Sequence, residues 1–262
     1  MFKSSFAGSV AAIVVILAGA CSMSPVDPTK DWGPDRLYYA ARSELEGKNY
    51  TKAIDYYQKL ESRYPYGRFA QQAQLDIAYA HWKDSDPALA LAACDRFIRE
   101  HPNHLNVDYA YYLKGRVNFN EDRGLLGFIS NKDLTERDPQ AAREAFDAFK
   151  ELVTRFPSSR YAKDAEARMK YLVNALAAHE VHVAEYYLRR AAYVAALNRA
   201  QNVITSYPRT PAVERALVVM VHAYNAMGLD QLRDDTKRTL AANFPGNTLA
   251  VRSNNQPWWK LW

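Results

Sequence analysis

The clearest structural signal in the chain is GKNYTKAIDYYQKLESRYP, residues 47–65. Its apolar residues recur at intervals of three and four, as in an amphipathic helix, and it ends at a proline that cannot continue one. Ala53, Tyr57 and Leu60 share one face of this helix. The stretch therefore predicts an amphipathic helix that Pro65 closes.

The same ending recurs at five prolines, which are spaced 37, 55, 51 and 37 residues apart: Pro65, Pro102, Pro157, Pro208 and Pro245. A small residue stands at one fixed place before the first four prolines, namely Ala53, Ala90, Ala145 and Ala196, whereas Arg233 stands before the fifth. A period in the thirties with two enlarged units is typical of stacked helical hairpins, because one hairpin cannot bury its own apolar face.

The units resemble tetratricopeptide repeats, and no alternating strand pattern competes with them. The resemblance implies that residues 47–65 hold the second helix of a hairpin and that the small Ala53 lets a neighbouring helix approach closely. The expected fold is all-α, an α-solenoid of about five tetratricopeptide-like helical hairpins. Hairpins one to three are predicted over residues 35–157 and hairpins four and five over 158–245, with one long helix from Tyr161 to about Arg190 between them. Three helices are expected to begin where a capping side chain precedes a proline, at Asp86, Asp138 and Thr210.

Residues 1–20 have the pattern of a secretory signal peptide, with one positive charge, an apolar run and small residues at its end. The run is shorter than the roughly 20 residues of a transmembrane helix. Ala18-Gly19-Ala20-Cys21 resembles the lipobox of bacterial lipoproteins, although Ala18 replaces the usual Leu. The resemblance implies that Cys21 carries a covalent lipid and begins the mature chain. Because Ser22 replaces the Asp that would retain it, the resemblance also implies the periplasmic side of the outer membrane.

The alternative is an ordinary secreted protein in which Cys21 is an incidental thiol. Residues 21–34 are rich in Ser, Pro and Asp and predict a flexible tether between the lipid and the folded body. If Cys21 carries the lipid, Cys94 is the one cysteine left, so the fold does not depend on an intrachain disulfide. Its place on an apolar helical stripe predicts a small buried side chain.

Composition and motifs argue against several classes of function. The net charge is +5 and no long cationic run occurs, which argues against nucleic-acid binding. No phosphate-binding loop or nucleophile motif is present, so we expect no enzyme, no catalytic residue and no cofactor beyond the lipid. His179 and His182 lie within one helical turn, but Val183 stands where the zinc-protease pattern needs histidine. A solvated helix face is favoured there over a metal site.

A protein-binding surface remains the favoured function. Tyrosines and basic residues accompany one another in the first three hairpins, and tyrosine supplies a large contact area at low entropic cost. Such a groove suits an extended peptide with aromatic side chains and a negative terminus. The candidate groove residues are Tyr38, Tyr56, Arg63, Tyr64, Arg68, Tyr79 and Arg96. The alternative is that these side chains pack in the core or only keep the surface soluble.

Two segments depart from the repeat pattern. Residues 121–137 separate the two helices of the third hairpin and carry apolar residues that either cover the adjacent core or form a lip for a partner. Residues 246–262 form a tail with three tryptophans, Trp258, Trp259 and Trp262. The tail either caps the last hairpin or docks on a membrane or a partner.

Several stretches resemble the tetratricopeptide-repeat lipoproteins of the outer-membrane β-barrel assembly machine, namely residues 63–67, 71–80, 95–99, 138–140 and 183–187. The likeness covers about residues 21–245. It implies a non-enzymatic subunit whose N-terminal repeats engage unfolded outer-membrane proteins and whose C-terminal repeats dock on the central barrel-shaped subunit. Small accessory lipoproteins are further implied partners.

Arg199 matches an arginine that this family places near the contact with the central subunit, although an ordinary helix-surface arginine is an equal alternative. Two other functions remain open on the sequence: a periplasmic envelope scaffold without a substrate groove, and an adaptor for a cell-wall hydrolase.

Overall fold

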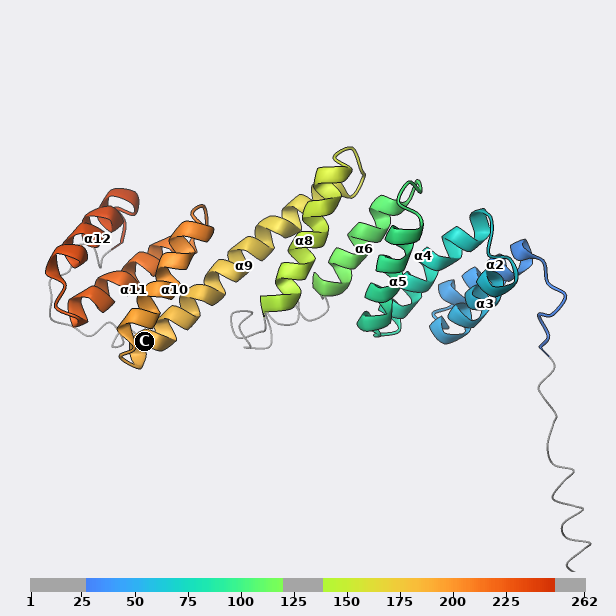
Figure 1. Ribbon diagram of the computed structural model, residues 1–262, viewed down its shortest axis with the longest axis horizontal. Helices are drawn as coiled ribbons and strands as arrows, with labels where there is room; N and C mark the ends of the chain where they lie inside the picture. The colour runs from blue at the N-terminus through green and yellow to red at the C-terminus, as the bar shows by residue number, and fades with distance from the viewer. Residues whose placement is uncertain (1–26, 120–138, 248–262) are drawn as a thin grey trace, which may run out of the picture.

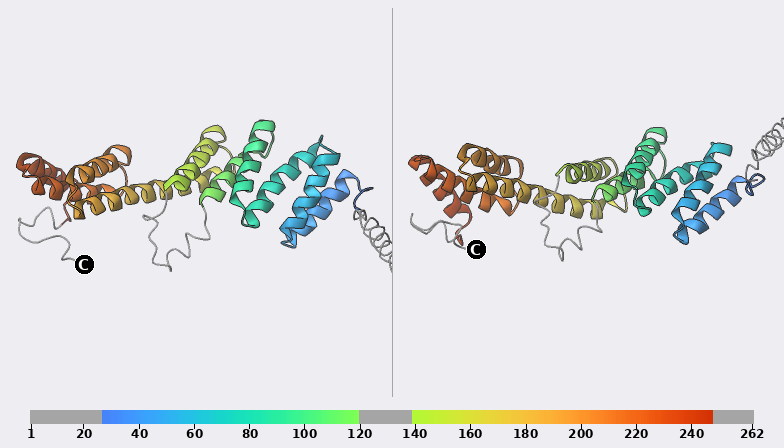
Figure 2. Two further views of the ribbon diagram at one scale, coloured as in Figure 1. Left: turned by 60° about the horizontal axis from the view of Figure 1, so that its bottom comes forward. Right: turned by 90° about the horizontal axis from the view of Figure 1, so that it is seen from below.

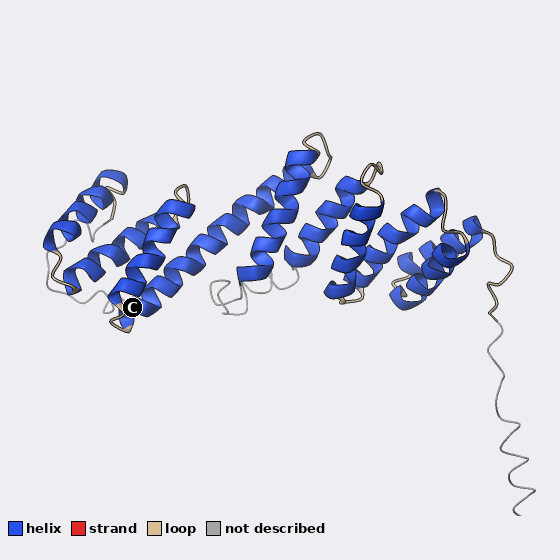
Figure 3. Ribbon diagram, in the orientation of Figure 1, coloured by secondary structure: helices blue, strands red, loops and turns tan. Residues whose placement is uncertain are grey.

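The computed structural model describes residues 27–119 and 139–247, and the regular structure in these ranges is entirely helical (Figures 1 and 3). The helices are α2 (Pro34–Glu46), α3 (Tyr50–Arg63), α4 (Arg68–Lys83), α5 (Pro87–Glu100), α6 (Val107–Phe119), α8 (Pro139–Arg155), α9 (Ala162–Arg189), α10 (Tyr193–Ser206), α11 (Ala212–Ala226) and α12 (Asp230–Asn243). In the described ranges, none of these helices has the length and hydropathy needed to cross a bilayer. The leader, Cys21, the 121–137 segment and the three tail tryptophans lie outside the described residues.

The helices pair into five consecutive antiparallel hairpins within the described chain. The pairs are α2 with α3, α4 with α5, α6 with α8, α9 with α10, and α11 with α12. The second helix of each hairpin also contacts the first helix of the next, so the hairpins form one continuous elongated row (Figures 1 and 2). The prediction of an α-solenoid of helical hairpins is confirmed.

Small residues allow the close packing inside each hairpin. Ala53, Ala90, Ala145 and Ala196 are all fully buried, and each belongs to one of the apolar clusters along the row. The large side chains around them include Tyr57, Phe97 and Phe149. Burial of such a side chain stabilises the fold by about 1.5–3 kcal/mol.

Arg233 replaces the small residue in the last hairpin, and the structure shows how it is accommodated. Its guanidinium pairs with Asp230 and Asp234 on its own helix and lies 3.3 Å from the amide oxygen of Asn225. Only Thr236 and Leu240 of α12 are buried, so the outer face of this helix is polar. A polar terminal helix is what an exposed end of a solenoid requires.

Helix α9 connects the two halves of the row. Its 28 residues begin in the cluster around Phe149, through Ala165 and Leu172, and end in the cluster that holds Val181 and Leu188. The prediction of one long helix between Tyr161 and Arg190 agrees with these bounds. The two halves are therefore joined by continuous helix over residues 162–189.

The predictions of helix starts at Asp86, Asp138 and Thr210 have different outcomes in the structure. The Asp86 carboxylate accepts a hydrogen bond from the Leu89 amide at 3.1 Å, as the capping pattern predicts. Thr210 does not cap α11, because its hydroxyl donates to the Tyr207 carbonyl at 2.9 Å and the helix begins at Ala212. The prediction at Thr210 was therefore wrong, and Asp138 lies outside the described residues.

The predicted flexible tether over 21–34 is too long at its C-terminal end. Residues 27–33 pack on the first hairpin, where Thr29 is fully buried. The Arg63 guanidinium binds both the Asp27 carboxylate and the Thr29 carbonyl oxygen, and the Tyr64 hydroxyl donates to the Trp32 carbonyl at 3.0 Å. These partners lie more than 30 residues away in sequence, so local composition did not reveal them.

Candidate protein-binding surfaces

The seven predicted groove residues do not gather in one groove. Tyr38 is 7% exposed, and its hydroxyl donates to the Asp76 carboxylate at 3.1 Å in the core between α2 and α4. Burial, followed by the negative charge of Asp76, raises the pKa of Tyr38 to about 12. Tyr38 is thus a structural residue, because the apolar face of α2 turns it inward.

Three more of the predicted residues surround the N-terminal segment instead of facing a groove. Arg63 and Tyr64 bind residues 27–32, as described above, and the Tyr56 ring lies 5.8 Å from the Trp32 ring. They come from α3 and its C-terminal cap, where helical periodicity places them together. Their polar groups are used within the chain.

Arg68 and Arg96 have different partners within the chain. Arg68 is exposed and its guanidinium lies over the Phe69 ring at 4.9 Å. Arg96 of α5 pairs with Glu61 of α3 at 2.9 Å. The side-chain amide of Gln74 on α4 donates to the same Glu61 at 3.0 Å, so these three residues bridge three consecutive helices.

Tyr79 belongs to an aromatic and cationic surface that the sequence prediction largely missed. We call it the aromatic–cationic strip; it comprises Tyr79, Trp82 and Lys83 of α4 with Tyr112 and Arg116 of α6. Two cations lie over the Trp82 ring, with Lys83 Nζ at 4.5 Å and Arg116 Cζ at 5.2 Å from its centre. The strip could have been predicted from one signal in the sequence, because all five of its residues lie on the first helices of hairpins.

The strip is fixed at its far end by α9. The Tyr112 hydroxyl donates to the Asp164 carboxylate at 2.8 Å, and its ring stacks on Tyr161 with centres 4.6 Å apart. Arg168 holds the same carboxylate at 2.6 Å. The pKa of Asp164 is lowered because the hydrogen bonds from Arg168 and Tyr112 outweigh the effect of its burial. A row of oriented rings and cations of this kind offers stacking and charge-assisted hydrogen bonds to a bound polypeptide.

Arg199, the predicted contact residue for the central subunit, lies at the junction of the two halves. It is about half exposed on α10 and pairs at 3.1 Å with Glu180, a buried carboxylate in the middle of α9. Arg143 of α8 approaches the same carboxylate from the other side, at 3.8 Å. Glu180 therefore ties three helices together, and Arg199 has a structural partner inside the chain.

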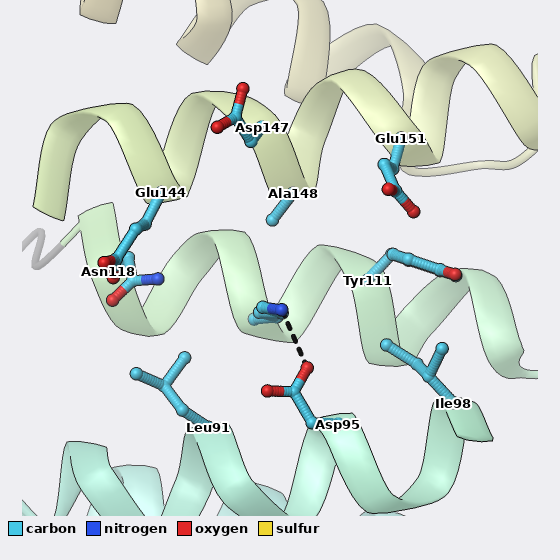
Figure 4. Close-up of a pocket in the computed structure, with 10 residues that line it drawn as sticks. Leu91, Asp95, Ile98, Tyr111, Asn118, Glu144, Asp147, Ala148 and Glu151 are labelled. Carbon is cyan, nitrogen blue, oxygen red and sulfur yellow. Dashed lines mark hydrogen bonds and ion pairs between the residues drawn. The ribbon is translucent and has the colours of Figure 1, made fainter. Parts of the chain in front are cut away.

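A groove lies between α5, α6 and α8, with a volume of about 560 Å³ (Figure 4). Its apolar part comes from Leu91, Ile98, Ala148 and the Tyr111 ring. Its charged lining has four carboxylates and one ammonium group, namely Asp95, Glu144, Asp147, Glu151 and Lys114. We call this feature the acidic groove.

Within residues 27–119 and 139–247, no three side chains of His, Cys, Asp or Glu come together as a metal site would require. Cys94 is fully buried, and burial raises the pKa of its thiol to about 12, so the reactive thiolate is disfavoured.

These features define a class of protein. A row of stacked hairpins that displays rings, ion pairs and a groove is the architecture of a helical-repeat scaffold, which works through its surfaces. Comparison with known proteins then gives the family. The model of the YfiO family, described as outer membrane lipoprotein, matches residues 30–240, and the chain belongs to this family.

Three relatives are each named outer membrane protein assembly factor BamD. The one from Neisseria meningitidis serogroup A is 50% identical over 237 residues, which cover 89% of both chains. The one from Vibrio cholerae is 38% identical and covers 88% of this chain and 95% of its own. The one from Haemophilus influenzae is 33% identical and covers 95% and 93%.

The resemblance noted in the sequence is therefore confirmed. The family description associates the chain with the outer membrane. Because the relatives are named as assembly factors, the chain is a non-enzymatic protein.

Proposed function

We propose that the chain is a lipid-anchored subunit of the machinery that assembles outer-membrane β-barrel proteins. It is held through a lipid on Cys21, faces the periplasm, and works beside the central barrel-shaped subunit and accessory lipoproteins. Membership of a family of outer membrane lipoproteins and the names of the relatives support this role. The observation that carries the binding mechanism is the aromatic–cationic strip on α4 and α6.

The strip suits an unfolded barrel segment for a chemical reason. Strands of such barrels alternate apolar and polar residues and carry aromatic rings at the membrane interfaces. Tyr79, Trp82 and Tyr112 offer ring surfaces to these side chains, while Lys83 and Arg116 can hold a carboxylate or backbone carbonyls. The C-terminal hairpins that carry Arg199, beginning at the junction of the two halves, form a separate surface for the central subunit.

The test uses a labelled peptide copied from the last strand of an outer-membrane β-barrel protein, with a free C-terminal carboxylate. The variant K83E/R116E reverses both cations of the strip, and we expect it to bind the peptide about tenfold more weakly. The matched control K150E/K163E makes the same change of charge on exposed positions of α8 and α9 and should bind normally. Equal binding by both variants would remove the strip from substrate recognition.

The partners in the machinery are tested separately. Purification of the full chain from detergent-solubilised envelopes should recover the central subunit and accessory lipoproteins. Recovery of a cell-wall hydrolase in their place would favour the adaptor role instead.

A further inference from the structure

The acidic groove is open where the equivalent place one hairpin earlier is closed. At the earlier junction, Glu61, Gln74 and Arg96 bridge α3, α4 and α5 through contacts of 2.9 and 3.0 Å. Counted from the alanines Ala53, Ala90 and Ala145 of the second helices, Glu61 corresponds to Ile98 and Arg96 to Glu151 of the acidic groove. Counted from the small residues Ala78 and Gly115 of the first helices, Gln74 corresponds to Tyr111. An aliphatic side chain, a ring and a carboxylate cannot form that bridge, so the space between α5 and α8 stays unfilled.

The charges of the groove are unbalanced. Lys114 pairs with Asp95 at 2.7 Å, and Glu151 lies 3.9 Å from Arg155, which also binds the Tyr111 hydroxyl. Glu144 accepts a hydrogen bond from the uncharged Gln140 at 2.9 Å. Asp147 makes no hydrogen bond or ion pair with the residues that the structure describes. A local excess of negative charge thus stands on a chain whose net charge is +5.

The geometry of the groove complements a helix with one apolar and one basic side. Figure 4 shows α6 between α5 and α8, with Leu91 and Ile98 directed toward it from α5 and Ala148 from α8. Glu144, Asp147 and Glu151 are spaced by three, four and seven residues, so they follow one face of α8. Apolar residues of a partner would fill the floor while its cations meet this row.

We propose that the acidic groove is a docking site for a cationic amphipathic segment of a partner polypeptide, with Lys or Arg residues at helical spacing. This site is distinct from the aromatic–cationic strip, whose charge has the opposite sign, and from the surface around Arg199. Binding depends on the three carboxylates of α8, so it weakens as salt screens them.

The test is fluorescence anisotropy with the full chain in a non-ionic detergent. The probe is a labelled peptide of Ala, Leu and Lys, matched in length to the 14 residues of α5, with Lys at every third or fourth position. We expect E144Q/D147N/E151Q to bind it about tenfold more weakly than the unmodified chain. The control E46Q/D55N/E166Q removes the same charge from exposed positions on α2, α3 and α9 and should bind normally.

A second variant tests the open space itself. I98E/E151R places Glu and Arg where Glu61 and Arg96 stand one hairpin earlier, and it should close the groove and abolish binding. Circular dichroism verifies that both variants remain helical, and the neutralised variant alone decides the matter if I98E/E151R unfolds. Equal weakening by the control, or equal binding of a peptide with Glu in place of Lys, would overturn the proposal. Self-association of the chain that E144Q/D147N/E151Q abolishes would also overturn it, since a second copy would then occupy the groove.

Discussion

Arg199 and Glu180 form an ion pair across the junction of the two halves, with Nη1 and Oε2 3.1 Å apart. The Glu180 side chain is only 4% exposed, whereas Arg199 is about half exposed. Loss of Arg199 therefore leaves a buried carboxylate with only Arg143 near it, at 3.8 Å. An effect of an Arg199 substitution on partner binding can arise inside the chain as well as at the contact.

The double variant R199A/E180Q separates these two origins. We expect R199A to lower the free energy of unfolding by about 1–3 kcal/mol, because it strands a buried charge, and E180Q to recover part of this loss. Urea unfolding measures both effects. Co-purification with the central subunit should stay defective in R199A/E180Q if Arg199 touches that subunit. Recovery of co-purification in the double variant would show that Arg199 acts only through Glu180.

The clamp between Arg63 and Asp27 should hold residues 27–33 on the first hairpin. The R63A variant removes the donor to Asp27 and to the Thr29 carbonyl, so the Thr29 amide should exchange with solvent much faster. Hydrogen exchange read by NMR or mass spectrometry gives the rate. The exposed Lys30 serves as the control, and K30A should leave exchange unchanged. Unchanged protection of Thr29 in R63A would contradict the clamp.

Acid should release the same clamp. The Thr29 amide, its hydroxyl and the nearby Lys59 and Arg63 lower the pKa of Asp27 to about 2. Because this pKa lies below the value of about 3.9 for an unfolded Asp, the contact is complete above that pH and is lost as the pH falls toward about 2. The Thr29 amide resonance should titrate with a midpoint near 2. A midpoint at the ordinary value would mean that the hydrogen bonds do not form in solution.

Gly115 should tolerate no side chain. A Cβ at this position would clash with the ring of Phe149, which is fully buried in the third hairpin. We expect G115A to lower the free energy of unfolding by about 1–3 kcal/mol, because the ring must shift within a packed core. The double variant G115A/F149L should recover part of the loss in urea unfolding. No loss in G115A would show that the two helices can separate freely.

Cys94 should resist thiol reagents in the folded chain. Its thiol is fully buried and its pKa is raised to about 12, so little thiolate is present at pH 8. Labelling with iodoacetamide should be at least tenfold slower than in the urea-unfolded chain, where the pKa is near its ordinary value. Similar rates in the two states would place Cys94 at the surface.

Local sequence was sufficient to predict the fold. Prolines close the second helices, alanines such as Ala53 and Ala90 mark the close contacts, and the unbroken stretch before Arg190 forms the long helix α9. These properties depend on steric limits and on a helical period, and both operate over a few residues. The paired hairpins follow because each apolar face must be covered by its neighbour.

Which residues make up each candidate binding surface was decided by tertiary contacts. Sequence reasoning found Tyr79 but not Trp82 and Arg116, and it placed Tyr38 and Arg63 in a groove although one lies in the core and the other holds Asp27. The residues that meet at each surface come from different helices and can be far apart in sequence, as with Tyr112 and Asp164, which are 52 positions apart. Residue type predicts what a side chain can bind, but the packing of whole helices brings its partners within reach.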